Sequence, residues 1–515
     1  MDTISQSTPK MIPQTPTSLQ KWLQEHHHLY WLICITITLI TTFSLFLFYK
    51  SSLLSKKKLK LPPCPSSTVP LVGNLHQLGS LPHRSMHALS QKHGPLMLLH
   101  LGKVPAIIIS SAELAQEIMK THDLIFSSRP FSFMAKSLLY NSLDIALSPY
   151  SEYWRQVRRI SVIHLLSLKR VQSFGSIREE EVYLMVDKIH ASQGSLVNLS
   201  EILVAVTNAV VCRVALGRKF DRSNRFHEML TELSVLIGSF PLKDFIPWLG
   251  WVDRITGLDA RVVNNSREMD NFFEEVLEDH IHSKTSETND LVHVLLSLDV
   301  PLSRDSIKAI ILQDMFTAGT DTTFTTLEWI MAELVRNPKV MEKVQEEIKG
   351  VVKGKAKVSE EDIVEMIYLK AVIKEALRLH PPIPLLVPRE STEHVKLHGF
   401  DIPEKTRVVI NAWAIGRDPK SWERPEEFMP ERFLNSEVDF KGQHFEFIPF
   451  GAGRRGCPGI MFAISTIELA VAALLHHFDW KLPDGMRTEE LDMSESLGFN
   501  AHMKTSLLVQ ATPRF

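Results

Sequence analysis

Residues 29–49 form an uninterrupted apolar run, which limits what the start of the chain can fold into. The 21 residues LYWLICITITLITTFSLFLFY contain no charged side chain. At about 1.5 Å per residue, a helix of this length crosses a hydrocarbon layer of about 30 Å. The run is apolar on all sides and has no polar stripe, which argues against a core helix of a water-soluble domain. We therefore predict a transmembrane helix.

The charges on either side of the run predict its orientation. Residues 1–28 carry two lysines and two acidic residues, whereas five lysines follow the run with no acidic residue between them: Lys50, Lys56, Lys57, Lys58 and Lys60. The more positive flank stays in the cytosol. We expect a lumenal extension over residues 1–28, a basic, proline-rich hinge over residues 50–65 and a cytosolic domain over residues 66–515, held at the membrane of the endoplasmic reticulum.

A cleaved secretory signal is the alternative interpretation of the apolar run. The run is too long for a signal core, and no small-residue cleavage site precedes the lysines. Four cysteines in 515 residues exclude a disulfide framework and fit a reducing compartment. The predicted topology leaves the sequons at Asn198 and Asn264 without glycans. A net charge of −2 provides no basic field for nucleic acid.

The rest of the chain reads as one large, mainly helical domain with a small sheet. We expect an apolar strand over residues 106–109, followed by a helix that Ser110 and Glu113 open as a capping box and that ends near residue 122. A long helical pattern runs from about residue 303 to residue 337 and carries AGTDTT in its middle. Further helices are predicted near residues 338–349, 360–379 and 459–477, with small strands between residues 394 and 411.

Residues 450–459, FGAGRRGCPG, hold the strongest chemical signal. Gly453 and Gly456 allow backbone conformations that a Cβ would forbid, and Pro458 suits a first helical turn. Cys457 would then lie at a helix N-terminus, which favours a thiolate. A thiolate there is a nucleophile or a metal ligand, and the absence of a second nearby cysteine argues against zinc. An inert buried thiol is the alternative, but it leaves the glycines and arginines unexplained.

This segment resembles the haem-binding loop of the cytochrome P-450 monooxygenases, F-x-x-G-x-R-x-C-x-G. The chain matches that pattern at Phe450, Gly453, Arg455, Cys457 and Gly459. The resemblance implies that Cys457 is the axial ligand of the iron in haem b. It also implies that Arg455 pairs with a haem propionate, that Phe450 packs beside the sulfur, and that Gly459 lets the helix approach the porphyrin. The implied fold is the cytochrome P-450 fold, mainly α with a minor β region, in a single large domain behind the N-terminal transmembrane helix.

The AGTDTT segment, residues 318–323, is the second signal. Glycine and threonines weaken a helical hydrogen-bond ladder, and a local bulge there would admit dioxygen or water. A packed helix with back-bonded threonines is the alternative. In the family this segment activates oxygen, which implies that Asp321 helps to deliver protons and that Thr322 hydrogen-bonds the activated dioxygen.

Other segments gain meaning from the same resemblance. Glu375 and Arg378 share one helix face, and the family adds Arg432 as the third member of a buried network that supports the Cys457 loop. For the haem propionates the resemblance assigns Trp154, Arg158 and Arg389.

The resemblance covers nearly the whole chain and is closest to the plant A-type microsomal enzymes of specialised metabolism. The chain has no flavin or nicotinamide motif, so electrons from NADPH would arrive through NADPH-cytochrome P-450 reductase, with cytochrome b5 as a further candidate donor. The substrate would be a small apolar terpenoid, alkaloid, phenylpropanoid or coumarin, oxidised with O2. Family positions place a lid loop over residues 131–139 and pocket residues at Phe316, Thr317, Leu385, Leu386, Val387, Leu497 and Phe499.

Two other functions fit a haem-thiolate site. One is a dehydratase or isomerase that acts on an oxime or a hydroperoxide without external O2. The other is a haem-binding sensor or scaffold without catalytic activity. Such dehydratases often lose the acid–alcohol pair, and a sensor has no need of it, so Asp321 and Thr322 favour the monooxygenase.

Overall fold

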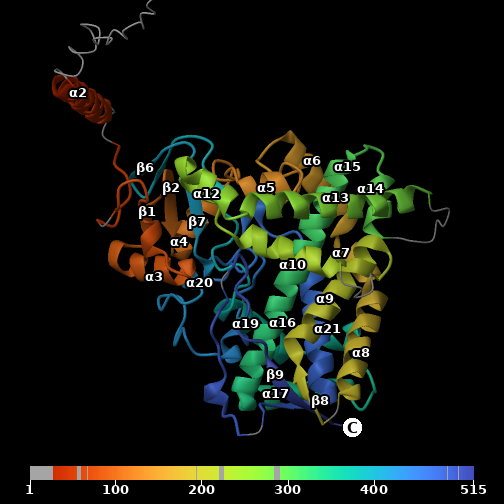
Figure 1. Cartoon of the computed structure of the whole chain (residues 1–515). Helices are drawn as coiled ribbons and strands as arrows, with labels where there is room; N and C mark the ends of the chain where they lie inside the picture. The colour runs from red at the N-terminus through yellow and green to blue at the C-terminus, as the bar shows by residue number, and fades with distance from the viewer. Residues whose placement is uncertain are drawn as a thin grey trace, which may run out of the picture. The chain divides into compact units, whose positions relative to one another are not determined.

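The computed structural model describes residues 27–54, 59–66, 68–192, 194–219, 225–282, 290–483, 485–496 and 498–514. The chain divides into two units, Met1–Lys60 and Leu61–Phe515. In the first unit, helix α2 (His27–Leu54) contains the predicted transmembrane segment (Figure 1). Its large apolar side chains between Trp31 and Phe46 are exposed. The hydroxyls of Thr36, Thr38, Thr41 and Thr42 donate to carbonyls within the helix, which leaves an apolar outer surface.

The second unit contains a four-stranded sheet in the order β1-β2-β7-β4. β1 (Leu96–Leu101) pairs antiparallel with β2 (Val104–Ile109), and β2 pairs in parallel with β7 (Arg407–Ile410). β4 (Arg389–Glu390) closes the other edge. The predicted strand over residues 106–109 is confirmed as the end of β2. Pro63 O accepts from Leu98 N at 2.8 Å, so the end of the predicted hinge packs beside this sheet.

Two smaller sheets are also present in the described residues. β3 (Leu196–Asn198), β9 (Leu508–Pro513) and β8 (Phe478–Lys481) form one, and β5 (Val395–Leu397) pairs with β6 (Phe400–Ile402) in the other. Strands do lie between residues 394 and 411, but they do not form one sheet, because β7 joins β2 in the first sheet.

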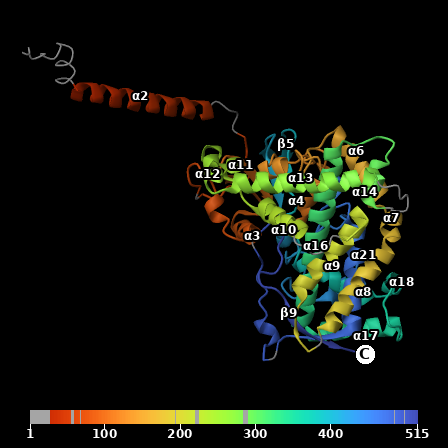
Figure 2. The same ribbon diagram turned by 45° about the vertical axis from the view of Figure 1, so that its right-hand side comes forward.

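Helices form the larger part of the second unit, and α16 (Ala318–Arg336) runs through its middle (Figures 1 and 2). It packs against α9 (Leu199–Leu216), α19 (Ile367–Leu379) and α21 (Ile460–His477). α9 and α21 are long and apolar enough to cross a membrane, but 67% and 72% of them are buried inside the protein. Both are therefore core helices of this unit.

The long helix predicted from residue 303 to residue 337 is present, with an irregular middle. Ser303 caps α15 (Arg304–Ala309), a π-helical segment η5 (Ile310–Thr317) follows, and α16 ends at Arg336, with Asn337 as its C-cap just before a proline. The bulge expected within AGTDTT thus lies directly before it. Thr317 Oγ1 donates to Leu312 O, five residues earlier, as the wider helical turn permits.

Three predicted helix boundaries were wrong. Ser111, one residue after the predicted cap, accepts from Leu114 N and opens α4 (Ala112–Gln116), which continues as the π-helical η2 (Glu117–Thr121). The helix predicted over residues 360–379 is broken into α18 (Glu360–Ile363) and α19. α21 begins at Ile460 with Gly459 as its N-cap, so Pro458 precedes the helix.

The remaining helices cover this framework. They are α3 (Pro82–His93), α5 (Phe133–Leu138), α6 (Glu152–Ile160), α7 (Leu168–Ser173), α8 (Gly175–Ala191), α10 (Arg225–Gly238), α11 (Leu242–Phe245), α12 (Gly250–Ile255), α13 (Leu258–His282), α14 (Leu291–Leu296), α17 (Pro338–Val352) and α20 (Ala412–Ile415), with short 3₁₀ turns that include Pro430–Phe433 and Gly453–Arg455.

Candidate active site

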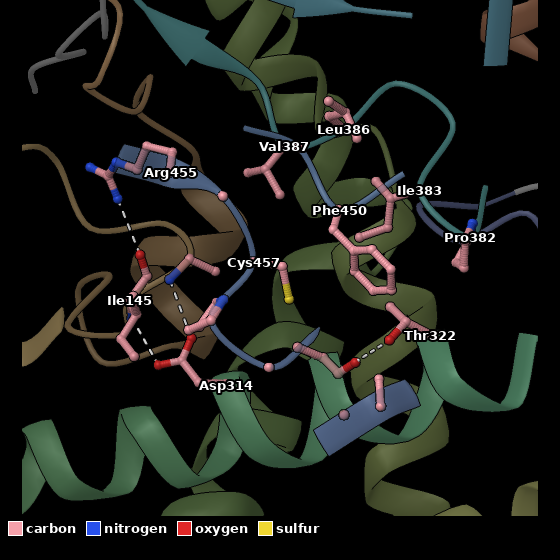
Figure 3. Close-up of a pocket in the computed structure, with 18 of the residues that line it drawn as sticks. Ile145, Asp314, Thr322, Pro382, Ile383, Leu386, Val387, Phe450, Arg455 and Cys457 are labelled. Atoms are coloured by element: carbon pink, nitrogen blue, oxygen red, sulfur yellow. Dashed lines mark hydrogen bonds between the residues drawn. The ribbon is translucent and has the colours of Figure 1, made fainter. Parts of the chain in front are cut away.

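The loop of residues 450–459 borders a cavity of about 190 Å³, which we call the cysteine cavity. Gly453 has φ +68°, and a Cβ there would lie 2.2 Å from the carbonyl oxygen of Met119, so only glycine fits. Cys457 N donates to Phe450 O at 2.9 Å. Figure 3 shows the sulfur of Cys457 and the ring of Phe450 in the same cavity.

The surroundings of Cys457 suit a metal ligand better than a free nucleophile. Burial raises the pKa of its thiol, and the Gly459 N–H and Arg158 act in the opposite direction. The helix terminus alone does not produce the thiolate that we expected, because α21 begins three residues later. A coordinated metal ion deprotonates a thiol outright and would supply the missing stabilisation.

Arginines line the cysteine cavity beside the sulfur. Arg455 is buried, donates to the carbonyls of Ser127, Ile145 and Ser148, and lies 4.1 Å from the ring of Trp154. Arg158, one turn after Trp154 on α6, donates to Gly456 O at 2.7 Å. Trp154 contacts Arg455 and donates to Ile145 O, so it supports the guanidinium from behind.

Two further arginines complete this wall. Arg389 lines the cavity but pairs with Asp123 at 3.2 Å, so its guanidinium already has a carboxylate partner. Arg129 was not predicted as a site residue. It is buried in the same cavity and donates to the backbone carbonyls of Ala146, Val387 and Pro388. The only hint of it in the sequence is a lone arginine before Pro130.

These four arginines form a positive wall in which only Arg389, among the described residues, has a carboxylate at ion-pair distance. Burial lowers the pKa of each arginine, and for Arg455 burial together with the nearby Arg389 and Arg158 brings the pKa to about 9. Within the described chain, Arg129, Arg158 and Arg455 have no carboxylate at ion-pair distance. A bound anion would relieve this repulsion. The two propionates of a haem, its flat apolar ring and its iron fit the arginines, the apolar walls and Cys457.

The acid and the alcohol of AGTDTT face different cavities. Thr322 lines the cysteine cavity, and its hydroxyl donates to Ala318 O at 2.6 Å (Figure 3). Asp321 lines a second cavity of about 470 Å³ and accepts from Ser234 Oγ of α10 at 2.7 Å. Successive helical residues point about 100° apart, which separates the two side chains.

A buried ionic network lies beneath the site. Glu375 accepts from Arg378 through both carboxylate oxygens at 2.8 Å and from Arg432 at 2.9 Å. Glu375 and Arg378 are fully buried side chains. Arg378 also donates to Gly416 O and Pro425 O, and Arg432 donates to Glu423 O, so the three residues hold together the irregular segment that precedes the Cys457 loop.

The model of the family described as Cytochrome P450 matches residues 62–507 of this chain. The chain belongs to the cytochrome P450 family. The P450 resemblance read from the sequence and the P450 fold, mostly helical with a small sheet region, are confirmed.

Named relatives place this P450 among plant enzymes. It is 55% identical to Cytochrome P450 71A1 of Persea americana, over 85% of this chain and 91% of the relative. It is 48% identical to norfluorocurarine oxidase of Strychnos sp, over 91% of this chain and 95% of the relative. Among solved structures, a zebrafish cytochrome P450 with abiraterone has a TM-score of 0.72 and 26% identity, covering 85% of this chain and 100% of that one. This P450 is thus a monooxygenase of specialised metabolism with a cysteine-ligated haem, O2 as oxidant and NADPH-derived electrons from a partner reductase.

The predicted pocket residues divide between the two cavities of this P450. Leu386 and Val387 line the cysteine cavity, whereas Phe316, Thr317 and Phe499 line the second cavity. Leu385 lines neither and packs under the first sheet, and Leu497 lies outside the described residues. Most of residues 131–139 form α5 and pack into the core, so they do not line either cavity.

Asp314, in the π-helical segment η5, is a further site residue that was not predicted from the sequence. Asp314 lines the cysteine cavity, and its carboxylate accepts from Ile145 N at 2.8 Å and from Ala146 N at 3.2 Å (Figure 3). Burial raises the pKa of this carboxyl well above its usual range, and the nearby Asp144 raises it further. Asp314 thereby ties the segment before AGTDTT to residues 145–146, and the carbonyl of Ile145 in turn accepts from Arg455 and Trp154. An acid inside the apolar run IILQDMF was the available signal.

Proposed function

We propose that this P450 is anchored in the endoplasmic reticulum membrane by α2 and hydroxylates or otherwise oxidises a small, largely apolar plant metabolite. Terpenoids, alkaloids and phenylpropanoid or coumarin compounds are the candidate classes. The observation that carries the proposal is one cavity in which Cys457, Thr322 and three arginines without a carboxylate at ion-pair distance in the described chain meet. Electrons come from NADPH-cytochrome P-450 reductase, with cytochrome b5 as a second candidate donor.

Each side chain then has a distinct task. Cys457 ligates the iron, and the bound haem supplies dioxygen activation and oxygen-atom transfer. Arg129, Arg158 and Arg455 bind the propionates. Arg389 acts through its contacts with Asp123 and Ala452 O, which hold the start of the Cys457 loop.

The remaining roles concern packing and protons. Phe450 covers the sulfur, Gly453 and Gly459 keep the loop close to the haem, and Trp154 positions Arg455. Thr322 presents a hydroxyl to the reacting oxygen. Asp321 holds and releases protons in the second cavity, where Ser234 Oγ donates to its carboxylate.

The first test is Cys457→Ser in the full chain. We expect loss of the reduced-carbonyl absorbance band that marks a haem-thiolate, because serine cannot replace the thiolate ligand. Cys64→Ser is the matched control, since Cys64 lies half-buried in the proline-rich hinge outside both cavities, and its band should persist. Survival of the band in Cys457→Ser would falsify the ligand assignment.

The second test is Thr322→Ala. Haem binding should persist, product should fall and hydrogen peroxide should rise, because the proton donor at the cavity is lost. Thr207→Ala is the control, since its hydroxyl also bonds back within a helix but lies outside both cavities. Tight coupling of NADPH use to product in Thr322→Ala would remove Thr322 from oxygen activation. Product formation by the unmodified protein without NADPH would favour the dehydratase or isomerase.

A further inference from the structure

The carboxylate of Asp123 lies against the start of the Cys457 loop. Asp123 follows the π-helical η2 by two residues, and its side chain is 14% exposed. It lines neither the cysteine cavity nor the second cavity. Any influence of Asp123 on the haem site therefore passes through the residues that it contacts.

Asp123 and Arg389 hold the backbone on both sides of Gly453. Asp123 Oδ2 accepts from the backbone N–H of Arg454 at 3.0 Å. Asp123 Oδ1 pairs with Arg389 at 3.2 Å, and Arg389 in turn donates to Ala452 O at 2.8 Å. The acid thus holds the N–H that follows Gly453, and the base holds the carbonyl that precedes it. We call the Asp123–Arg389 pair the loop clamp.

Gly453 brings the loop backbone into direct contact with residues 119–123. A Cβ at this glycine would lie 2.2 Å from Met119 O and 2.7 Å from Asp123 Oδ1. The carboxylate is therefore packed against the backbone that it holds. Because hydrogen bonds to charged groups are stronger than neutral ones, the loop clamp fixes both the position and the direction of residues 452–454.

The clamped residues lead directly to the cysteine. Gly453–Arg455 is one 3₁₀ turn, and Gly456 N donates to Gly453 O at 3.0 Å. Cys457 is the next residue, and its sulfur lies in the cysteine cavity (Figure 3). A shift of the 3₁₀ turn would therefore move the sulfur as well.

The loop clamp also supplies the counter-charge of Arg389. This guanidinium is 3% exposed and lines the cysteine cavity together with the three other arginines. Burial lowers its pKa, and the Asp123 carboxylate acts in the opposite direction. Removal of one partner from a buried ion pair leaves the other charge uncompensated. Loss of Asp123 would also remove the contact that orients Arg389 toward Ala452 O.

We propose that Asp123 is a positioning residue of the haem-thiolate site, which holds residues 452–454 through the loop clamp and thereby keeps the Cys457 sulfur on the iron. This inference rests on the proposed function, in which Cys457 is the iron ligand. The alternative is that Asp123 contributes only to the stability of the fold. A positioning role requires that the bond between sulfur and iron is lost while the fold is still intact.

The test compares Asp123→Ala and Asp123→Asn with the unmodified full-chain, haem-loaded protein. Glu360→Gln is the matched control, because Glu360 pairs at 2.6 Å with the fully buried Arg178 and lies outside both cavities. Each protein is held in urea below its own unfolding transition, which circular dichroism defines. The loss of the reduced-carbonyl band of the haem-thiolate is then followed with time.

We expect Asp123→Ala to lose this band about tenfold faster than the unmodified protein while its circular dichroism persists, because a hydrogen bond to a charged group is removed from the loop. Asp123→Asn keeps an oxygen that can accept from Arg454 N but loses the charge, so its rate should be intermediate. Glu360→Gln should lose the band at the rate of the unmodified protein, because it leaves the loop clamp in place.

The outcomes separate this inference from the proposed function. An unmodified protein without the haem-thiolate band contradicts the proposed function. If that band is present and the two Asp123 variants lose it no faster than Glu360→Gln, the positioning role alone is overturned. If Asp123→Ala does not fold, Asp123→Asn decides the question: a faster loss than in Glu360→Gln supports the loop clamp, and an equal rate overturns it.

Discussion

At the scale of single residues, burial decides what an ion pair contributes. Glu375 and Arg378 are three residues apart and fully buried, and Glu152 and Arg155 have the same spacing but are 87% and 49% exposed. Glu375→Gln leaves two buried guanidinium groups without a full counter-charge and should lower the free energy of unfolding by about 3–5 kcal/mol. Glu152→Gln should change it by only about 0.3–0.5 kcal/mol.

Urea denaturation followed by circular dichroism measures both variants. Equal stability losses in the two would mean that the Glu375–Arg378–Arg432 network holds the segment before the Cys457 loop no better than a solvated pair does.

At the scale of elements, the apolar helix α21 carries a largely buried acid, Glu468. The pKa of Glu468 is raised to about 7, mainly by burial, while Lys370 acts in the opposite direction and Glu360 of α18 adds to the rise. A raised carboxyl pKa means that the folded protein holds the proton more tightly than the unfolded chain. The contribution of Glu468 to stability is thus fully present below about pH 4.5 and is lost as the pH rises through 7.

Glu468→Gln removes this loss. The free energy of unfolding of the variant should equal that of the parent near pH 5. At pH 8 it should exceed that of the parent by on the order of 2–3 kcal/mol. Urea midpoints at the two pH values, with the exposed Glu361→Gln of α18 as control, measure the difference. If the stability of Glu468→Gln relative to the parent does not rise between pH 5 and pH 8, the Glu468 carboxyl is in contact with water and its pKa is not raised.

At the scale of the whole molecule, the prediction concerns the two sides of the membrane. Protein made in microsomes should carry no glycan at Asn198 or Asn264, and added protease should digest the catalytic domain while residues before α2 stay protected. The reason is the cluster of lysines that follows the apolar run. Gel shifts on glycosidase treatment and protease mapping measure the orientation. A glycan at either asparagine would show that the catalytic domain lies in the lumen and would contradict the prediction. A sequon engineered into residues 1–28 is the positive control.

The sequence by itself determined the chemistry of this P450, because each chemical signal lies within a short segment. The Cys457 loop, the AGTDTT segment and the spacing of Glu375 and Arg378 are local patterns, and so is the uninterrupted apolar run of α2. The caps at Ser303 and Asn337 are local as well, which explains why the long helix was predicted at its observed ends.

Only the tertiary structure decided which of these groups meet. Packing placed Arg129 in one cavity with Cys457, more than three hundred residues away in the chain. It also paired Arg389 with Asp123 and brought the Asp314 carboxylate within hydrogen-bond distance of Ile145 N. The turn of α16 sent the consecutive residues Asp321 and Thr322 into separate cavities. Residue types and spacings specify chemistry and local conformation, but contacts across hundreds of residues depend on how buried surfaces fit together.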